Sequence, residues 1–162
     1  MKIDWKWDVA DAGFAAIIKK AAQAALEVEE ISAPCGVFIR VTDDAGIREV
    51  NRAHRQIDSP TDVLSFPEIR YKKGQTLRDV PNKLKAAYDV DTGCAMLGDI
   101  VISLERVLKQ AEEYGHTPQR EMAYMVVHAV CHLMGYDHIV DEDKRLMRQR
   151  EETALNRAGE GR

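Results

Sequence analysis

Three of the five histidines in this chain lie within the eleven residues from His128 to His138. If this stretch is helical, His128 and His132 are one turn apart and direct two imidazoles toward one point. Gly135 can adopt the left-handed conformation that ends a helix, so the chain can turn back and bring in His138. Three neutral imidazoles bind a divalent transition metal, zinc by default, and leave a fourth position for water, as in catalytic sites. The alternative is three unrelated histidines, one or two of them in a core, and the third histidine beyond a helix-ending glycine favours the metal.

The same spacing occurs in the metzincin proteases, whose signature is His-Glu-x-x-His-x-x-Gly-x-x-His and whose glutamate is the general base. The glutamate position is Ala129 here, and alanine cannot transfer a proton. The metal geometry is therefore kept and the protease chemistry is lost. Cys131 diverges in direction from His132, which favours a buried thiol over a fourth ligand. Asp137 either orients a ligand imidazole or is a turn residue.

Three arginines recur on one face of a helix predicted over residues 45–57, namely Arg48, Arg52 and Arg55. They begin a segment, residues 48–85, that has nine Lys/Arg against five Asp/Glu in a chain of net charge −4. Such a segment fits local contact with phosphates or an ordinary solvated face. We prefer the solvated face for Arg48 and Arg52. His54, on the other face of the helix, is expected to be packed in the core or at a cleft edge and not to be a ligand.

The bulk composition predicts one domain over residues 1–162, because a chain of 162 residues that is 45% hydrophobic can bury a sizeable core. No apolar run approaches the length of a membrane span, and Met1-Lys2-Ile3-Asp4 does not resemble a signal peptide. Three widely spaced cysteines suit a reducing cytosol better than a disulfide framework, so we expect a cytoplasmic protein with no membrane partner.

Alternating and helical periodicities predict the elements that position these residues. The expected strands span residues 3–7, 36–42, 63–66 and 97–103. The expected helices span residues 9–29, 45–57, 104–114, 118–134 and 141–158. Residues 68–95 are polar with no sustained period, which indicates either a mobile surface insertion or a flap over a site. The helix over 118–134 is apolar on most sides and is therefore expected to be central, with its histidines toward its C-terminal end.

Three segments carry a recognisable pattern, namely residues 51–67 (NRAHRQIDSPTDVLSFP), residues 97–103 (LGDIVIS) and residues 128–138 (HAVCHLMGYDH). Together they resemble the bacterial YbeY family. The similarity covers essentially the whole chain in order. Three positions depart from the family pattern without removing a ligand: Ala129 replaces a usual glycine, His54 a usual aromatic, and Cys131 a usual leucine.

The resemblance implies an α+β fold in which a small mixed β-sheet is flanked by about five helices. It also implies a metal-dependent endoribonuclease that acts on single-stranded RNA in small-subunit ribosomal RNA 3′-end maturation and ribosome quality control. The ribosome or its small subunit would be a partner. His128, His132 and His138 would bind one divalent transition-metal ion, Zn²⁺ by default. Arg55 and His128 would be catalytic. Arg48 and Arg52, for which a solvated face is preferred, are the remaining candidates for substrate contact.

The chemistry of the residues agrees with that activity. A cation held by three neutral ligands can lower the pKa of bound water to about 7. Arg55 could hold the scissile phosphate through two hydrogen bonds. Whether the water attacks directly or activates the ribose 2′-OH stays open, as does the oligomeric state. Two rival interpretations are a metzincin-like metalloprotease and a non-catalytic, metal-stabilised protein that binds the ribosome.

Overall fold

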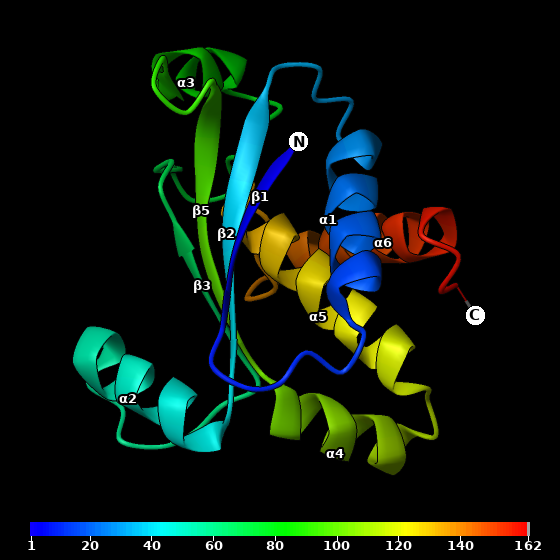
Figure 1. Cartoon of the computed structure of the whole chain (residues 1–162). Helices are drawn as coiled ribbons and strands as arrows, with labels where there is room; N and C mark the ends of the chain where they lie inside the picture. The colour runs from blue at the N-terminus through cyan, green and yellow to red at the C-terminus, as the bar shows by residue number, and fades with distance from the viewer. Residues whose placement is uncertain (162) are drawn as a thin grey trace.

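A five-stranded mixed sheet is the frame of the protein, whose computed structural model describes residues 1–161 (Figure 1). The main path runs β1-β2-β5-β3. Its strands are β1 (Lys2–Trp7), β2 (Cys35–Thr42), β5 (Cys94–Ser103) and β3 (Val63–Pro67). The first three are parallel, and β3 runs antiparallel along β5. The short β4 (Tyr88–Asp89) also pairs with β5. The expected α+β class and mixed sheet are confirmed.

The main core lies between one face of this sheet and the helices α1 (Ala15–Val28) and α5 (Pro118–Leu133). Alternate residues of β2 point into it, and Val37, Ile39 and Val41 are completely buried. The helix α1 connects the parallel strands β1 and β2, as a crossover between neighbouring parallel strands requires. Helix α5 packs against α1, α4 (Leu104–Tyr114) and α6 (Asp141–Arg157), which confirms its predicted central position.

A second, smaller core lies on the opposite face of the sheet under helix α2 (Asp44–Arg55). It contains Ile47, Leu64 and Val101, and Val101 alternates along β5 with residues of the main core. Asp43 begins the helix, and its side chain accepts a hydrogen bond from the Gly46 backbone at 2.8 Å. This packing places the C-terminal end of α2 beside β3.

Two predicted helix boundaries were wrong. The helix expected from residue 9 begins at Ala15, because Gly13 has a φ of +87° and Asp11 accepts hydrogen bonds from the Gly13 and Phe14 backbone. That local turn competes with helical hydrogen bonding. The helix expected to reach residue 57 ends at Arg55, because Gln56 takes a left-handed conformation. Ile57, expected on the buried face, is consequently 52% exposed.

The polar region 68–95 is packed against the body of the protein, so the mobile-insertion alternative was wrong. It contains β4 and a short helix that was not predicted, α3 (Pro81–Ala86). Ile69, Leu77 and Leu84 are buried. The Leu77 amide also donates to the Met134 carbonyl at 2.8 Å, which ties this region to the end of α5.

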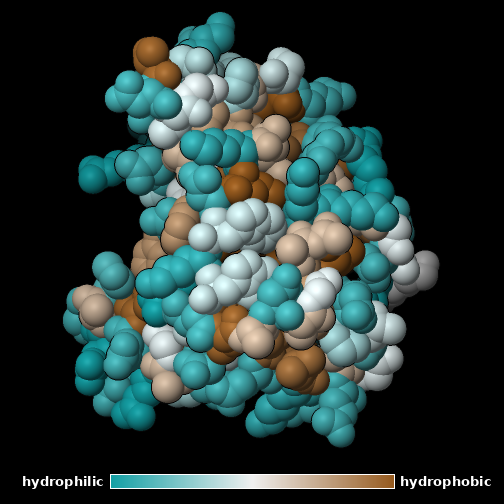
Figure 2. Space-filling model, viewed as in Figure 1, coloured by the Kyte–Doolittle hydropathy of each residue, from teal (hydrophilic) through white to brown (hydrophobic). Residues whose placement is uncertain are grey.

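No helix among residues 1–161 combines the length and apolar character needed to cross a bilayer. The face of the molecule drawn in Figure 2 is mostly hydrophilic, and its apolar residues form small separate patches.

Candidate metal centre

Helix α5 positions two of the three predicted ligands. Thr117 caps its start, accepting from the Arg120 backbone at 3.1 Å, and Pro118 occupies its first turn, as predicted. Most of the helix is buried, whereas His128 and His132 are only partly so. Because the two histidines are four residues apart, both rings leave the same side of the helix, at the edge of the core.

The turn after α5 brings in the third ligand. The Gly135 amide donates to the His132 carbonyl at 3.0 Å, and the Tyr136 amide donates to the Cys131 carbonyl at 3.1 Å. This is the Schellman pattern, in which the residue after the helix is left-handed. Gly135 has the required φ of +93°. The chain then reverses, and His138 approaches the two helical histidines from the side, as predicted from the sequence.

A side chain at Gly135 would also collide with the region 68–95. A Cβ there would lie 2.6 Å from the Gln75 carbonyl oxygen and 2.9 Å from the Tyr71 ring. The Tyr71 hydroxyl in turn donates to the Leu133 carbonyl at 2.9 Å. The turn that carries His138 is therefore enclosed by a segment more than fifty residues earlier in the chain.

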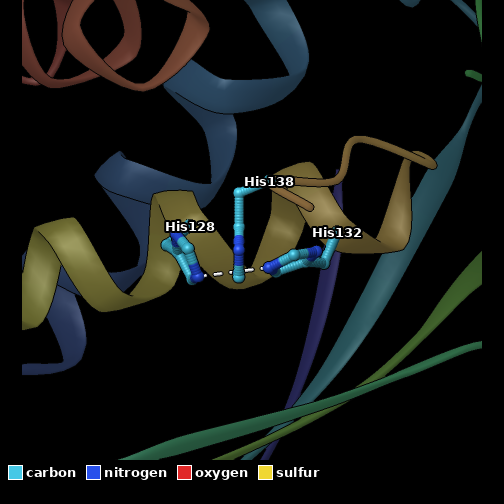
Figure 3. Close-up of side chains that lie close together, drawn as sticks. All are labelled: His128, His132 and His138. Carbon is cyan, nitrogen blue, oxygen red and sulfur yellow. Dashed lines mark hydrogen bonds between the residues drawn. The ribbon is translucent and has the colours of Figure 1, made fainter. Parts of the chain in front are cut away.

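The three imidazoles converge in the geometry of a metal site. Figure 3 shows His128 and His132 on α5 pointing toward each other, with His138 entering between them from the loop. One ring nitrogen of each lies within 4.8 Å of the others. The Nε2 atoms of His128 and His132 are 3.1 Å apart. Two nitrogens bound tetrahedrally to one zinc at ordinary bond lengths are about 3.3 Å apart. The residues therefore fit a metal ion.

Hydrogen bonding at the far side of two rings favours a cation between them. The Nδ1 of His132 lies 2.9 Å from the Tyr136 carbonyl oxygen, which can only accept, so this nitrogen carries the proton. The Nδ1 of His128 lies 2.5 Å from Oε1 of Glu151, which favours the same tautomer. In the neutral rings both Nε2 atoms are then bare lone pairs facing each other. A shared metal ion satisfies both.

The protonation of His132 suits this role. Burial, together with the neighbouring charge of His128, lowers the pKa of His132 to about 4. Its imidazole is thus neutral around pH 7, the form that binds metal. Burial also raises the pKa of the Cys131 thiol, and the side chain is 2% exposed, which confirms the prediction of a buried thiol. Asp137 accepts from the His138 backbone at 2.7 Å, as a turn residue does.

Glu151 is the functional candidate that sequence reasoning missed. It lies on α6, is 6% exposed, and contacts His128 from the side opposite the cluster. A carboxylate on the outer nitrogen of a ligand imidazole fixes the ring and makes it a stronger ligand. The signal that could have identified it is its helical spacing with the buried residues of α6, which are Met147, Glu151, Ala154 and Leu155. A charged residue within such a stripe requires a partner.

Glu151→Gln is expected to weaken metal binding by about 10-fold, because outer partners of ligand histidines contribute a factor of about 10–100. The amide has no charge with which to strengthen the imidazole. Competition with a chromophoric chelator measures the dissociation constant. The matched control is Glu152→Gln, the exposed neighbour on the same helix, which should leave the constant unchanged. Equal constants for wild type and Glu151→Gln would show that Glu151 does not support the site.

Arg55 shares a large open cavity with the three histidines. The cavity has a volume of about 1080 Å³ and lies between the end of α2, strand β3, the segment 69–74 and the turn after α5. The Arg55 Nη2 donates to the Ser65 carbonyl at 2.9 Å, and the guanidinium lies 5.2 Å from the centre of the Phe66 ring. The side chain remains exposed. Its remaining donors are available to a ligand in the cavity.

The other two arginines of α2 are arranged differently. Neither Arg48 nor Arg52 lines this cavity. Arg48 already binds Asp58 through two hydrogen bonds of 2.8 and 3.1 Å. That pair lowers the pKa of the Asp58 carboxyl. Substrate contact by Arg48 and Arg52 thus stays a prediction. His54 is exposed, with its ring centre 5.4 Å from that of Phe66, and lies outside the histidine cluster.

The charge around the cavity is mixed, with an excess of cations. Four basic residues line it, Arg55, Arg70, Lys72 and Lys73, against three acidic ones, Asp62, Asp137 and Asp143. Three of the four cations come from the segment 69–74. The region 68–95 therefore contributes one wall of the site, as its flap interpretation predicted. A cation on the three neutral histidines would add to this positive charge.

Comparison with known proteins agrees with the geometry. The family model described as Endoribonuclease YbeY matches residues 2–159. A protein of Clostridium acetobutylicum named Endoribonuclease YbeY is 45% identical over 140 residues, covering 86% of this chain and 84% of its own. One of the same name from Clostridium kluyveri is 42% identical over 143 residues, covering 88% of this chain and 87% of its own.

A third protein of that name, from Caldanaerobacter subterraneus subsp. tengcongensis, is 41% identical over 147 residues, covering 91% of this chain and 89% of its own. Among solved structures, the solution structure of TM1509 from Thermotoga maritima matches with a TM-score of 0.57 and 22% identity. The match covers 96% of this chain and 90% of that one. At this identity the match supports the fold alone.

Proposed function

The chain belongs to the YbeY family of endoribonucleases, and we propose that it cleaves single-stranded RNA with His128, His132 and His138 holding one divalent metal ion. We propose zinc as that ion, because three neutral imidazoles with one free position form a typical catalytic zinc site. In this proposal Arg55 binds the phosphate that is cleaved. Arg48 and Arg52 contribute to RNA binding farther from the reaction.

The observation that carries the proposal is the joint presence of the histidine cluster and Arg55 in one open cavity. A phosphodiester is an anion whose charge increases as it reacts. The cavity offers it a guanidinium, neighbouring lysines and a site for a divalent cation. The cavity is open to solvent, so a strand of RNA can reach it, whereas a closed pocket could admit only a small molecule.

A divalent ion in this site would supply Lewis-acid chemistry, polarising a phosphoryl oxygen or lowering the pKa of a water. The chain's own residues orient the metal ligands and bind the phosphate. Glu151 and the Tyr136 carbonyl fix the His128 and His132 rings with their Nε2 atoms toward the cavity. Arg55 is steadied by the Ser65 carbonyl and the Phe66 ring, which limits the entropy it loses on binding phosphate.

The protease alternative is not favoured. The position of the metzincin glutamate is Ala129, which is 1% exposed and cannot act as a base. The nearby Glu151 contacts Nδ1 of His128, on the side of the ring away from the cluster, so it does not replace that glutamate. The relatives are named as endoribonucleases, which also opposes the non-catalytic alternative.

Family membership further supports a place in ribosomal RNA processing. We propose that the substrate is the 3′ region of small-subunit ribosomal RNA, and that the partner is the small subunit or the ribosome. We propose the cytoplasm as the location, where the three buried cysteines would remain free thiols.

The proposed chemistry is tested by incubating the purified chain with labelled single-stranded RNA, a DNA strand of the same sequence, and casein. We expect cleavage of RNA, no cleavage of casein, and loss of RNA cleavage with a chelator. DNA should be cut poorly if the 2′-OH participates and comparably if water attacks directly. Metal-dependent proteolysis beside intact RNA would contradict the proposal.

A further inference from the structure

A buried carboxylate, Glu29, lies behind the metal centre at the end of α1 and has no part in the chemistry proposed above. Its side chain is 2% exposed. Oε2 accepts from the Tyr136 hydroxyl at 2.8 Å and from Nε of Arg78 at 2.8 Å. Oε1 lies 3.5 Å from Nε of Arg150. A buried charge is costly unless it is paired, and Glu29 is surrounded by two arginines and a tyrosine hydroxyl.

Tyr136 is the link between this carboxylate and the metal ligands. Its ring is buried, and its hydroxyl donates to Oε2 of Glu29. The backbone carbonyl of the same residue accepts from Nδ1 of His132 at 2.9 Å. Tyr136 thus contacts Glu29 through its side-chain hydroxyl and the predicted metal ligand His132 through its backbone carbonyl.

The cluster also joins two other parts of the chain to that turn. Arg78 belongs to the region 68–95, and it donates to the Val28 carbonyl at 3.0 Å as well as to Glu29. Arg150 directly precedes Glu151, the carboxylate that contacts His128. Arg150, near Glu29, and Glu151, beside His128, are therefore neighbouring residues of α6. A displacement at Glu29 would be transmitted to the turn that carries His138.

We propose that Glu29 and Tyr136 are positioning residues of the metal centre, forming a latch that holds the Tyr136 carbonyl against His132. The latch fixes the His132 tautomer with Nε2 bare and fixes the turn from which His138 reaches the cluster. The inference rests on the metal site of the proposed function and is independent of what substrate is cleaved.

The test is the affinity of Tyr136→Phe for Co²⁺ and Zn²⁺, measured by chelator competition, together with the absorption spectrum of bound Co²⁺. The substitution removes one oxygen and keeps the buried ring. We expect affinity to fall about 10-fold, as for loss of an outer-shell partner, and the Co²⁺ bands to shift as the ligand geometry loosens. Tyr88→Phe, at an exposed tyrosine on β4, is the matched control and should change neither.

Substitutions at Glu29 distinguish a specific latch from a general effect on packing. Glu29→Gln keeps an oxygen that can accept from Tyr136, and we expect it to retain most of the affinity. Glu29→Ala removes the acceptor and should match Tyr136→Phe. Urea unfolding of the metal-free chains checks that each variant is folded at the temperature of the assay. If Glu29→Ala does not fold, the comparison of Tyr136→Phe with Tyr88→Phe still decides the question.

Unchanged affinity and an unchanged Co²⁺ spectrum in Tyr136→Phe would overturn the latch while leaving the metal site intact. An equal loss in Tyr88→Phe would overturn it as well, because the effect would not be specific to the turn. Failure of the wild-type chain to bind either metal would instead refute the metal site itself. The two failures are therefore distinguishable.

Discussion

His132→Ala is expected to abolish tight metal binding and, with it, RNA cleavage. Wild-type chain should retain about one divalent ion through dialysis, and the variant close to none. The substitution removes the His132 Nε2 atom, which lies 3.1 Å from Nε2 of His128. Only His128 and His138 are then left as ligands. Loss of a ligand should exceed the factor of about 10–100 that loss of an outer-shell partner costs. Elemental analysis gives the metal content, and labelled RNA gives the cleavage rate.

The matched control is His116→Ala. His116 is partly exposed, pairs with Glu121 at 3.3 Å and lies outside the cluster. The control chain should keep its metal and its cleavage rate. Undiminished metal in a chain in which His128, His132 and His138 are all alanine would exclude this site.

Arg55→Ala is expected to reduce RNA turnover by about 10²–10³-fold, the usual effect of removing one donor that stabilises transition-state charge. Metal content and folding should be unchanged, because the side chain is exposed and, within residues 1–161, makes a single hydrogen bond, to Ser65. Arg55→Lys should restore little, since an ammonium cannot reproduce the planar two-point contact of a guanidinium with phosphate. Single-turnover kinetics separates this loss from weaker binding.

Arg48→Ala and Arg52→Ala are the controls on the same helix. Both should act mildly, through the salt dependence of RNA binding and not through turnover. Arg48 should have the smaller effect because Asp58 already offsets its charge. If the three alanine variants cleave RNA equally well, Arg55 has no special role.

The ligands were predictable because their geometry is local. Spacing on one helix sets the direction of His128 and His132, and Gly135 ends that helix in the conformation that its sequence allows. The strands were similarly visible, since β2 is rich in β-branched and aromatic residues with strong strand preference. Family resemblance then connected Arg55 to a site more than seventy residues away along the chain.

The supports of the site were not predictable, because they depend on packing between distant segments. Glu151 meets His128 through the crossing of α6 over α5, which no local pattern specifies. Glu29 is 107 residues from Tyr136, its hydrogen-bond partner. The sequence left the region 68–95 open between a mobile insertion and a flap, because the three separated apolar residues that anchor it are too few to form a period. These are tertiary contacts, and their energies appear only when the elements are assembled.

The central claim is that a metal ion on the three histidines is needed for RNA cleavage. Its most direct test is to titrate the metal-free chain with Zn²⁺ while measuring bound metal and the cleavage of labelled RNA in the same samples. We predict that activity rises in proportion to bound metal and reaches its plateau at one ion per chain. Full cleavage by a chain holding a negligible fraction of an ion would contradict the account.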